Sequence, residues 1–180
     1  MRRSELEHAI RASTDIIRTD KVIVIGSQSI LASFTEDELP DEATRSLEVD
    51  IAPMNDDDAE SLATELDAAI GELSSFHNTH GFYVQGVGRD TAVLPAGWTD
   101  RLVTVNNANT SGRAGLCLDP HDLCVAKLIA GRPKDHLFVG ALLEHDLVDA
   151  RTIADRLETV VNDDIRRDRA LDWVRSTLRP

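Results

Sequence analysis

Two carboxylates and a glycine-serine pair are the residues of this chain whose types and spacing best suit chemistry. Gly26 and Ser27 close the β-branched run at 22–25, and Glu48 and Asp50 stand two residues apart in a second strand-like run. Because side chains alternate across a strand, both carboxylates project from one face, where together they can bind Mg²⁺. A strand that turns into a helix at Gly-Ser offers free backbone N–H groups to a phosphate. The pattern indicates nucleotide chemistry.

The residues around the acids support a half-buried strand. Leu47, Val49 and Ile51 alternate with the two acids, as expected where one face packs and the other carries polar function. An acid pair alone would equally suit the solvated face of an edge strand in an acidic protein. The Gly-Ser pair upstream favours the nucleotide site.

Lys127 is the single charge in the otherwise apolar run 123–130. Such a lysine can cover apolar surface with its alkyl chain and carry its ammonium group to solvent. It can instead face a cleft, where its charge would stabilise the phosphates during nucleotidyl transfer. The residues alone leave both alternatives open. The segment 132–135, one turn further on, could add a second set of contacts.

The elements that must position these residues can be predicted from periodicity and capping patterns. In the N-terminal half we expect a helix from the capping-box pattern at Ser4–Glu7 through Ile17, a strand at 21–26, a helix at 28–34, a polar loop at 35–44, a strand at 46–52, and a helix that begins at the acidic triplet 56–58 and ends near Ser74. The triplet is interpreted as first-turn acids that complement the helix dipole.

The second half changes from strands to helices. Short β-rich runs at 82–84, 91–94, 102–105 and 114–118 predict a meander. After them, Asp119 and Pro120 cap and start a helix through Ala130, which Gly131 ends; another begins at 134–135, and two more have caps at Asp149 and at Asn162 or Asp163. We interpret His77 and His80 as surface or turn residues.

Length and composition indicate a single domain. With 180 residues, the chain suits one core, which we divide into a sheet-and-helix part at 1–118 and a helical part at 119–180. No run is long and apolar enough for a membrane span or a signal peptide, so we expect a cytoplasmic protein. Cys117 and Cys124 have no metal or disulfide spacing and are expected to be buried thiols.

The charge is unevenly distributed. The net charge of −13 argues against diffuse attraction to nucleic acid over the whole surface. However, residues 35–72 carry fourteen acids and one base, whereas residues 87–134 carry six bases and four acids. A polyanion could meet a basic face if the fold gathers Arg89, Arg101, Arg113, Arg132 and Lys134. Scattered solubilising charge is the alternative.

Taken together, these motifs resemble the minimal nucleotidyltransferases of the AbiEii and MenT toxin group. The resemblance rests on Gly26-Ser27, the strand Ser46–Asp50, and the block from Asp122-Leu123 and Lys127 to Asp135, with further similarity over 94–103. It covers most of the chain, and the motifs stand in the expected order. It implies the polymerase-beta-like nucleotidyltransferase fold, an α+β core with a small mixed sheet followed by a C-terminal helical portion.

The resemblance also implies an activity and roles for residues. Members transfer a nucleoside monophosphate from an NTP, and the MenT toxins add it to the 3′ end of tRNA. By position, Gly26, Ser27, Lys127 and Arg132 would bind the nucleotide, Glu48 and Asp50 would bind Mg²⁺, and Lys127 and Asp135 would complete the catalytic site. Asp135 would act as a base or hold Lys127. Ser46 stands where these toxins carry a hydroxyl that a kinase-like antitoxin can phosphorylate, which would repel metal and NTP.

Two features depart from the family pattern. Glu48 stands where members usually carry Asp, and its extra methylene displaces the carboxylate by about an ångström, enough to impair catalysis. The strands predicted between 81 and 118 carry no third carboxylate, as a full two-metal site of the polymerase kind would require. The chain could therefore be an inactive binding module of a toxin-antitoxin pair or on RNA, or an enzyme that modifies a hydroxyl of a small molecule or protein.

Overall fold

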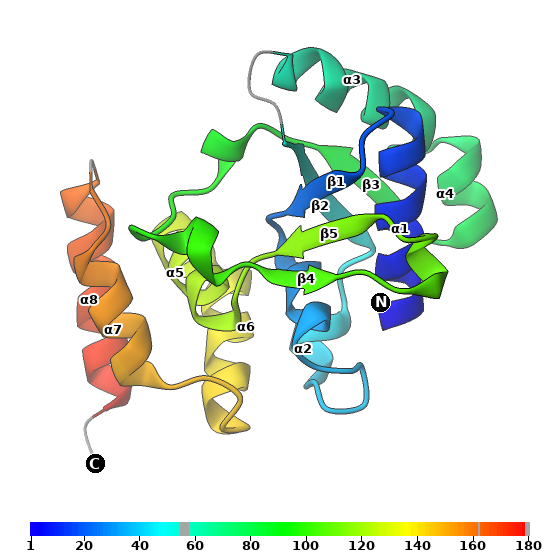
Figure 1. Ribbon diagram of the computed structural model, residues 1–180. Helices are drawn as coiled ribbons and strands as arrows, with labels where there is room; N and C mark the ends of the chain where they lie inside the picture. Colours follow the sequence, from blue (N-terminus) through cyan, green and yellow to red (C-terminus); the bar gives the residue numbers. More distant parts are fainter. Residues whose placement is uncertain (55–57, 162, 179–180) are drawn as a thin grey trace.

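A five-stranded mixed sheet forms the centre of the protein (Figure 1). The computed structural model describes residues 1–54, 58–161 and 163–178. The strands are β1 Lys21–Val24, β2 Glu48–Pro53, β3 Tyr83–Gly86, β4 Val103–Val105 and β5 Ala114–Cys117, in the order β3-β2-β1-β5-β4. The pairs β1–β2 and β4–β5 are antiparallel, whereas β1–β5 and β2–β3 are parallel. The predicted α+β class is confirmed.

Helices precede, connect and follow the strands of the sheet. The α-helices are α1 Arg3–Ile16, α2 Asp41–Thr44, α3 Ala59–Ile70, α4 Ser75–His80, α5 Pro120–Ala130, α6 Pro133–Glu144, α7 Ala150–Glu158 and α8 Asp164–Thr177, and the 3₁₀ helices are η1 Ser27–Ala32, η2 Arg89–Thr91, η3 Trp98–Arg101 and η4 Ala108–Thr110. The helical C-terminal part is as predicted. None of the described helices is long and apolar enough to cross a membrane.

The predicted meander is wrong. β3 pairs with β2 and β4 pairs with β5, so β3 and β4 lie on opposite edges of the sheet. The run at 91–94 forms no strand in the described chain; it leaves η2 and its residues Thr91, Ala92 and Val93 line a cavity. A β-branched composition favours extended backbone, but hydrogen-bond partners from distant segments decide whether a strand forms.

Three predictions about helix starts also need correction. At α1, the backbone N–H of Arg2 donates to Glu5 Oε2 at 2.7 Å, so the capping carboxylate is Glu5 rather than Glu7. The helix expected at 28–34 is the 3₁₀ helix η1, and the side chain of Arg3 donates to the carbonyls of Leu31 and Ala32 at its end. In the acidic triplet, the residues at 56–57 lie outside the described chain, and Asp58 is the N-cap of α3.

Two glycines let helices approach the sheet closely. A Cβ on Gly115 of β5 would lie 2.3 Å from Ile10 Cδ1 of α1, and a Cβ on Gly86 of β3 would lie 2.1 Å from the Ala63 carbonyl oxygen of α3. Both contacts are far inside van der Waals distance. Because these two glycines carry no side chain, α1 can pack directly on β5 and α3 can pack directly on β3.

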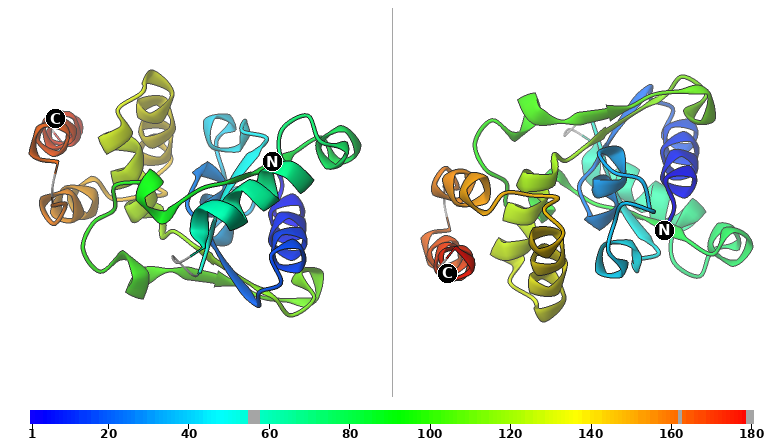
Figure 2. Two further views of the ribbon diagram at one scale, coloured as in Figure 1. Left: turned by 90° about the horizontal axis from the view of Figure 1, so that it is seen from above. Right: turned by 90° about the horizontal axis from the view of Figure 1, so that it is seen from below.

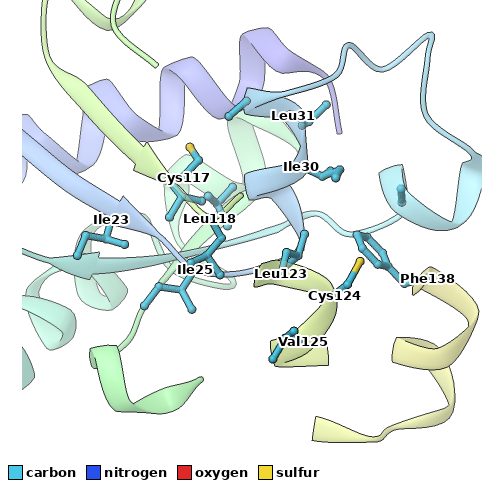
Figure 3. Packing of buried hydrophobic residues seen from close by; sticks show 14 of the residues in the cluster. Ile23, Ile25, Ile30, Leu31, Cys117, Leu118, Leu123, Cys124, Val125 and Phe138 are labelled. Atoms are coloured by element: carbon cyan, nitrogen blue, oxygen red, sulfur yellow. The ribbon is translucent and has the colours of Figure 1, made fainter. Parts of the chain in front are cut away.

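The hydrophobic core continues from the sheet into the C-terminal helices. Figure 3 shows Ile25, just after β1, near Leu118 and Leu123, with Cys124 and Phe138 further along α5 and α6. Both cysteines are buried and free, as expected. In Figure 2, α7 and α8 lie side by side, with α5 and α6 between this pair and α1.

A buried ion network attaches these outer helices. Asp122 of α5 has no exposed surface and accepts hydrogen bonds from Arg101 Nε at 2.9 Å and from Arg156 Nη1 of α7 at 2.8 Å. A buried carboxylate is stable only when it is well paired. Here two guanidinium groups from different segments provide that pairing and join η3 and α7 to α5.

We predict opposite stability effects for two glycine-to-alanine changes. Gly86→Ala should lower the free energy of unfolding by about 1–3 kcal/mol, because the new methyl group meets the backbone of α3. Gly140→Ala, inside α6 with nothing within 4 Å of the new Cβ, should raise it by about 0.5–1 kcal/mol through helix propensity. Urea unfolding of both variants checks this; equal effects would show that α3 does not press on β3.

Candidate active site

Except for Asp135, the predicted site residues line one cavity of about 380 Å³. Gly26 and Ser27 reach it from the β1–η1 connection, Glu48 and Asp50 from β2, and Lys127 from α5. Arg132, at the start of α6, and Ser46 also line it. Ligand sites have volumes of a few hundred cubic ångströms and a few convergent polar groups. Segments about a hundred residues apart in sequence thus form one polar cavity.

The two carboxylates of β2 interact directly. Burial raises the pKa of Asp50 to about 7, and its hydrogen bond with Glu48 and the charge of Glu48 act in the same direction, against Lys127 and Arg132. A pair of carboxylates that holds a proton in this way is a site where a cation can replace that proton. The donor set therefore fits a divalent cation with oxygen ligands.

Within the described residues, no cluster of three or more His, Cys, Asp or Glu side chains is arranged to hold a metal. Two carboxylates are nevertheless sufficient for Mg²⁺, which usually keeps waters and takes its remaining ligands from substrate phosphates. Any cation held by Glu48 and Asp50 would therefore arrive with, or be completed by, a phosphate ligand.

The Asp50 carboxylate packs against Gly26, in space that a side chain at position 26 would fill. A Cβ at Gly26 would lie 1.6 Å from Asp50 Oδ2 and 2.5 Å from its Cγ. The backbone N–H of Ile25 also donates to the Asp50 carbonyl at 3.0 Å, which continues the β1–β2 pairing. The glycine is thus required for the close approach of the carboxylate to the backbone, a reason that differs from the phosphate contact predicted from sequence.

Lys127 is buried and paired. Its side chain is 10% exposed, and its Nζ lies 3.3 Å from Asp135 Oδ1 and 4.8 Å from the centre of the Phe138 ring. Burial lowers the pKa of Lys127, while Asp135 opposes that shift. Lys127 therefore lines the cavity with a charge held by Asp135, and the solvent-reaching alternative does not describe it.

Asp135 lies beside Lys127 and does not line this cavity, but it does line a smaller neighbouring cavity. It has no exposed surface and accepts hydrogen bonds from Arg132 Nε at 2.6 Å and from Lys127. Burial alone would raise the pKa of Asp135, but hydrogen bonds from Arg132 and the charge of Lys127 outweigh it and lower the pKa. Of the two roles left open, this geometry suits holding the cations and not accepting a proton.

Ser46 stands beside the carboxylates. Its Oγ accepts from the backbone N–H of Glu48 at 3.2 Å, and its carbonyl accepts from Gln28 Nε2 at 3.2 Å. Ser46, Ser27 and Lys127 also line a second cavity of about 300 Å³ next to the first. Ser46 therefore lines both cavities.

The structure adds wall residues that the sequence did not predict as site residues. Thr91, Ala92 and Val93 form an apolar part of the first cavity, and Arg166 of α8 reaches it from the C-terminal end of the chain. Arg166 is in an ion pair with Asp163. The sequence signal for this residue is the group of four arginines in α8. That composition does not indicate which of the arginines lines the cavity.

The basic face expected from sequence is not gathered as a whole. Arg132 and Lys134 line the cavity, but Arg101 is paired with Asp122, and Arg113 is paired with Asp20 at the other end of β1. Arg89 donates to the carbonyls of Pro53 and Met54. The positive charge near the site is therefore limited and local.

Comparison with known proteins identifies one family. A family model described as nucleotidyltransferase of unknown function (DUF6036) matches residues 4–175. No curated protein and no solved structure matches the chain. The family description supports nucleotidyl transfer in general and a nucleoside triphosphate as substrate, and it assigns no acceptor.

The carboxylate pair predicts a pH-dependent stability. Because the pKa of Asp50 rises from 3.8 to about 7 on folding, the folded protein holds a proton that the unfolded chain has released, so stability falls as the pH rises through this range. Asp50→Asn should therefore be more stable than wild type at about pH 8, by about 4 kcal/mol, and nearly equal to it at about pH 4. Urea unfolding with a chelator present tests this, with exposed Asp155→Asn as control; a constant difference between the two pH values would contradict it.

Proposed function

We propose, from the premise that this chain belongs to the nucleotidyltransferase family of unknown function (DUF6036), that it transfers a nucleoside monophosphate from an NTP to the 3′ end of tRNA. The observation that carries the proposal is one cavity that holds the Glu48–Asp50 pair and the charge of Lys127. Transfer of this kind depends on positioning and neutralising phosphates, which these groups can do.

Each residue has a role in that reaction. Glu48 and Asp50 would hold Mg²⁺, which, when bound, neutralises phosphate charge and orients the leaving pyrophosphate. Lys127 would stabilise charge on the phosphates, and Asp135 keeps that ammonium group in place. Gly26 leaves room for Asp50, and Ser27 and Arg132 would bind phosphate oxygens. The acceptor hydroxyl oxygen forms a bond to the α-phosphorus as the bond from that phosphorus to pyrophosphate breaks, and the hydroxyl proton passes to solvent water.

The tRNA acceptor and the toxin role rest on the resemblance to the AbiEii and MenT group. Its motifs supply the residues that line the cavity, Ser46 among them. An antitoxin kinase that phosphorylates Ser46 would place two negative charges beside Glu48 and Asp50, where they would repel NTP and compete for the cation. This regulation is part of the proposal.

A second candidate is a binding module without catalysis, or an enzyme that modifies a hydroxyl of a small molecule or protein. The scattered positions of Arg89, Arg101 and Arg113 favour it, because RNA binding needs several cations on one surface. Glu48 in place of Asp favours the module.

The first test is label transfer. Purified protein is incubated with total tRNA, Mg²⁺ and each α-labelled NTP in turn. We expect label on tRNA for wild type and for the control Asp155→Asn, and a loss of at least about 100-fold for Asp50→Asn, which removes one charge from the same kind of side chain. Absence of label with every NTP, from folded protein and intact tRNA, would contradict an RNA acceptor.

The second test separates RNA from small acceptors. Lys134 is exposed on the cavity rim, so Lys134→Glu should reduce tRNA labelling about tenfold and lower the salt dependence of tRNA binding by about one phosphate contact. The control is Lys21→Glu, exposed at the far end of β1. Both variants should bind NTP with similar affinity in calorimetry. Equal labelling by the two variants would favour a non-RNA acceptor.

A further inference from the structure

Tyr83 is joined to the site without lining it. It lies on β3 directly opposite Glu48 in the parallel β2–β3 register, so both side chains are on the same face of the sheet. The Tyr83 hydroxyl donates to Glu48 Oε2 at 3.3 Å. Among the described residues that surround the two cavities, Tyr83 does not occur. Any effect of Tyr83 on the chemistry must therefore pass through Glu48.

The position of Tyr83 is itself fixed. Its backbone N–H donates to the Leu47 carbonyl at 2.9 Å, and its ring lies against the ring of His77 with centres 4.9 Å apart. His77 is itself held in place. Its ring Nδ1 accepts from the backbone N–H of Leu73 at 3.1 Å, and the backbone N–H of His77 donates to Ser74 Oγ. The hydroxyl group is therefore presented to Glu48 from a rigid support.

The two carboxylates differ in how much support they need. Asp50 is held by its short side chain and by close packing on Gly26. Glu48 has one more rotatable bond and is only half-buried, so it can adopt more rotamers and loses more entropy when it is fixed. A hydrogen bond to one of its oxygens removes part of that freedom.

We propose that Tyr83 is a positioning residue that fixes the rotamer of Glu48 for cation binding. This hydrogen bond allows the longer glutamate to act as a cation ligand at a position where an aspartate, with fewer rotamers, would need no such support. The inference rests on the proposed function only in that Glu48 and Asp50 bind the divalent cation. His77 belongs to the same arrangement as the support of the Tyr83 ring.

A double-mutant cycle tests the proposal without requiring turnover. Wild type, Tyr83→Phe, Glu48→Asp and the double variant are titrated with Mn²⁺ in the presence of a non-hydrolysable NTP analogue, and free Mn²⁺ is followed by electron paramagnetic resonance. We expect Tyr83→Phe to weaken Mn²⁺ binding about tenfold, as for loss of a hydrogen bond to a charged group. In the Glu48→Asp background the same change should have less than about a twofold effect, because the shorter carboxylate is withdrawn from the hydroxyl.

The matched control is Thr79→Val, which also deletes a hydroxyl but in α4, where the Thr79 hydroxyl donates to the Ser75 carbonyl and, among the described residues, bonds nothing outside its own helix. It should leave Mn²⁺ affinity unchanged. Thermal unfolding of all variants accompanies the titration, so a loss of affinity with unchanged midpoint is distinguished from a folding defect.

The outcomes separate the two proposals. An equal loss of Mn²⁺ affinity in both backgrounds, or no loss in the wild-type background, overturns the role of Tyr83, even if wild type transfers nucleotides. The expected cycle in a protein that labels no acceptor supports the role of Tyr83 while the proposed function fails. Absence of Mn²⁺ binding by wild type overturns both.

Discussion

The buried carboxylate of Asp135 is the constraint on which the rest of the site depends. An isolated ammonium group as deeply buried as that of Lys127 would lose its proton or move toward solvent. Asp135 prevents this by accepting from Lys127 and Arg132 together, one from the end of α5 and one from the start of α6. The turn between these helices, where Gly131 has φ of 66°, brings the three groups together. A cationic wall thereby faces the acids of β2.

This opposition of charges explains how a strongly acidic protein can handle an anionic substrate. Glu48 and Asp50 line the cavity from β2, and Lys127 and Arg132 line it from α5 and from the start of α6. Over a short range, fixed groups of this kind outweigh a net charge of −13 spread over the surface, since salt screens the distant charges. The substrate that best matches such a cavity carries both signs itself, as a complex of a divalent cation with a polyphosphate does.

Local signals predicted much of the site, and contacts between distant segments account for what was missed. The helix at Pro120–Ala130 agrees with its prediction because Asp119, Pro120 and Gly131 mark its ends by local chemistry. The acid pair was found because strand periodicity is also local. The edge position of β3 depends on its pairing with β2, and the edge position of β4 depends on the pairing of its neighbour β5 with the distant strand β1. Likewise, Arg101 does not join a basic face because it forms an ion pair with Asp122. Arg166 reaches the cavity only through the packing of α8, which the local sequence does not reveal.

The contact between Gly26 and Asp50 has an evolutionary consequence. Since a methyl group at position 26 would lie 1.6 Å from the carboxylate, neither position can drift alone. A lineage that keeps the acid must keep the glycine, and a lineage that gains a side chain at 26 is released from selection on the acid. In related chains, a residue other than glycine at position 26 would therefore mark descendants that no longer use this cavity for chemistry.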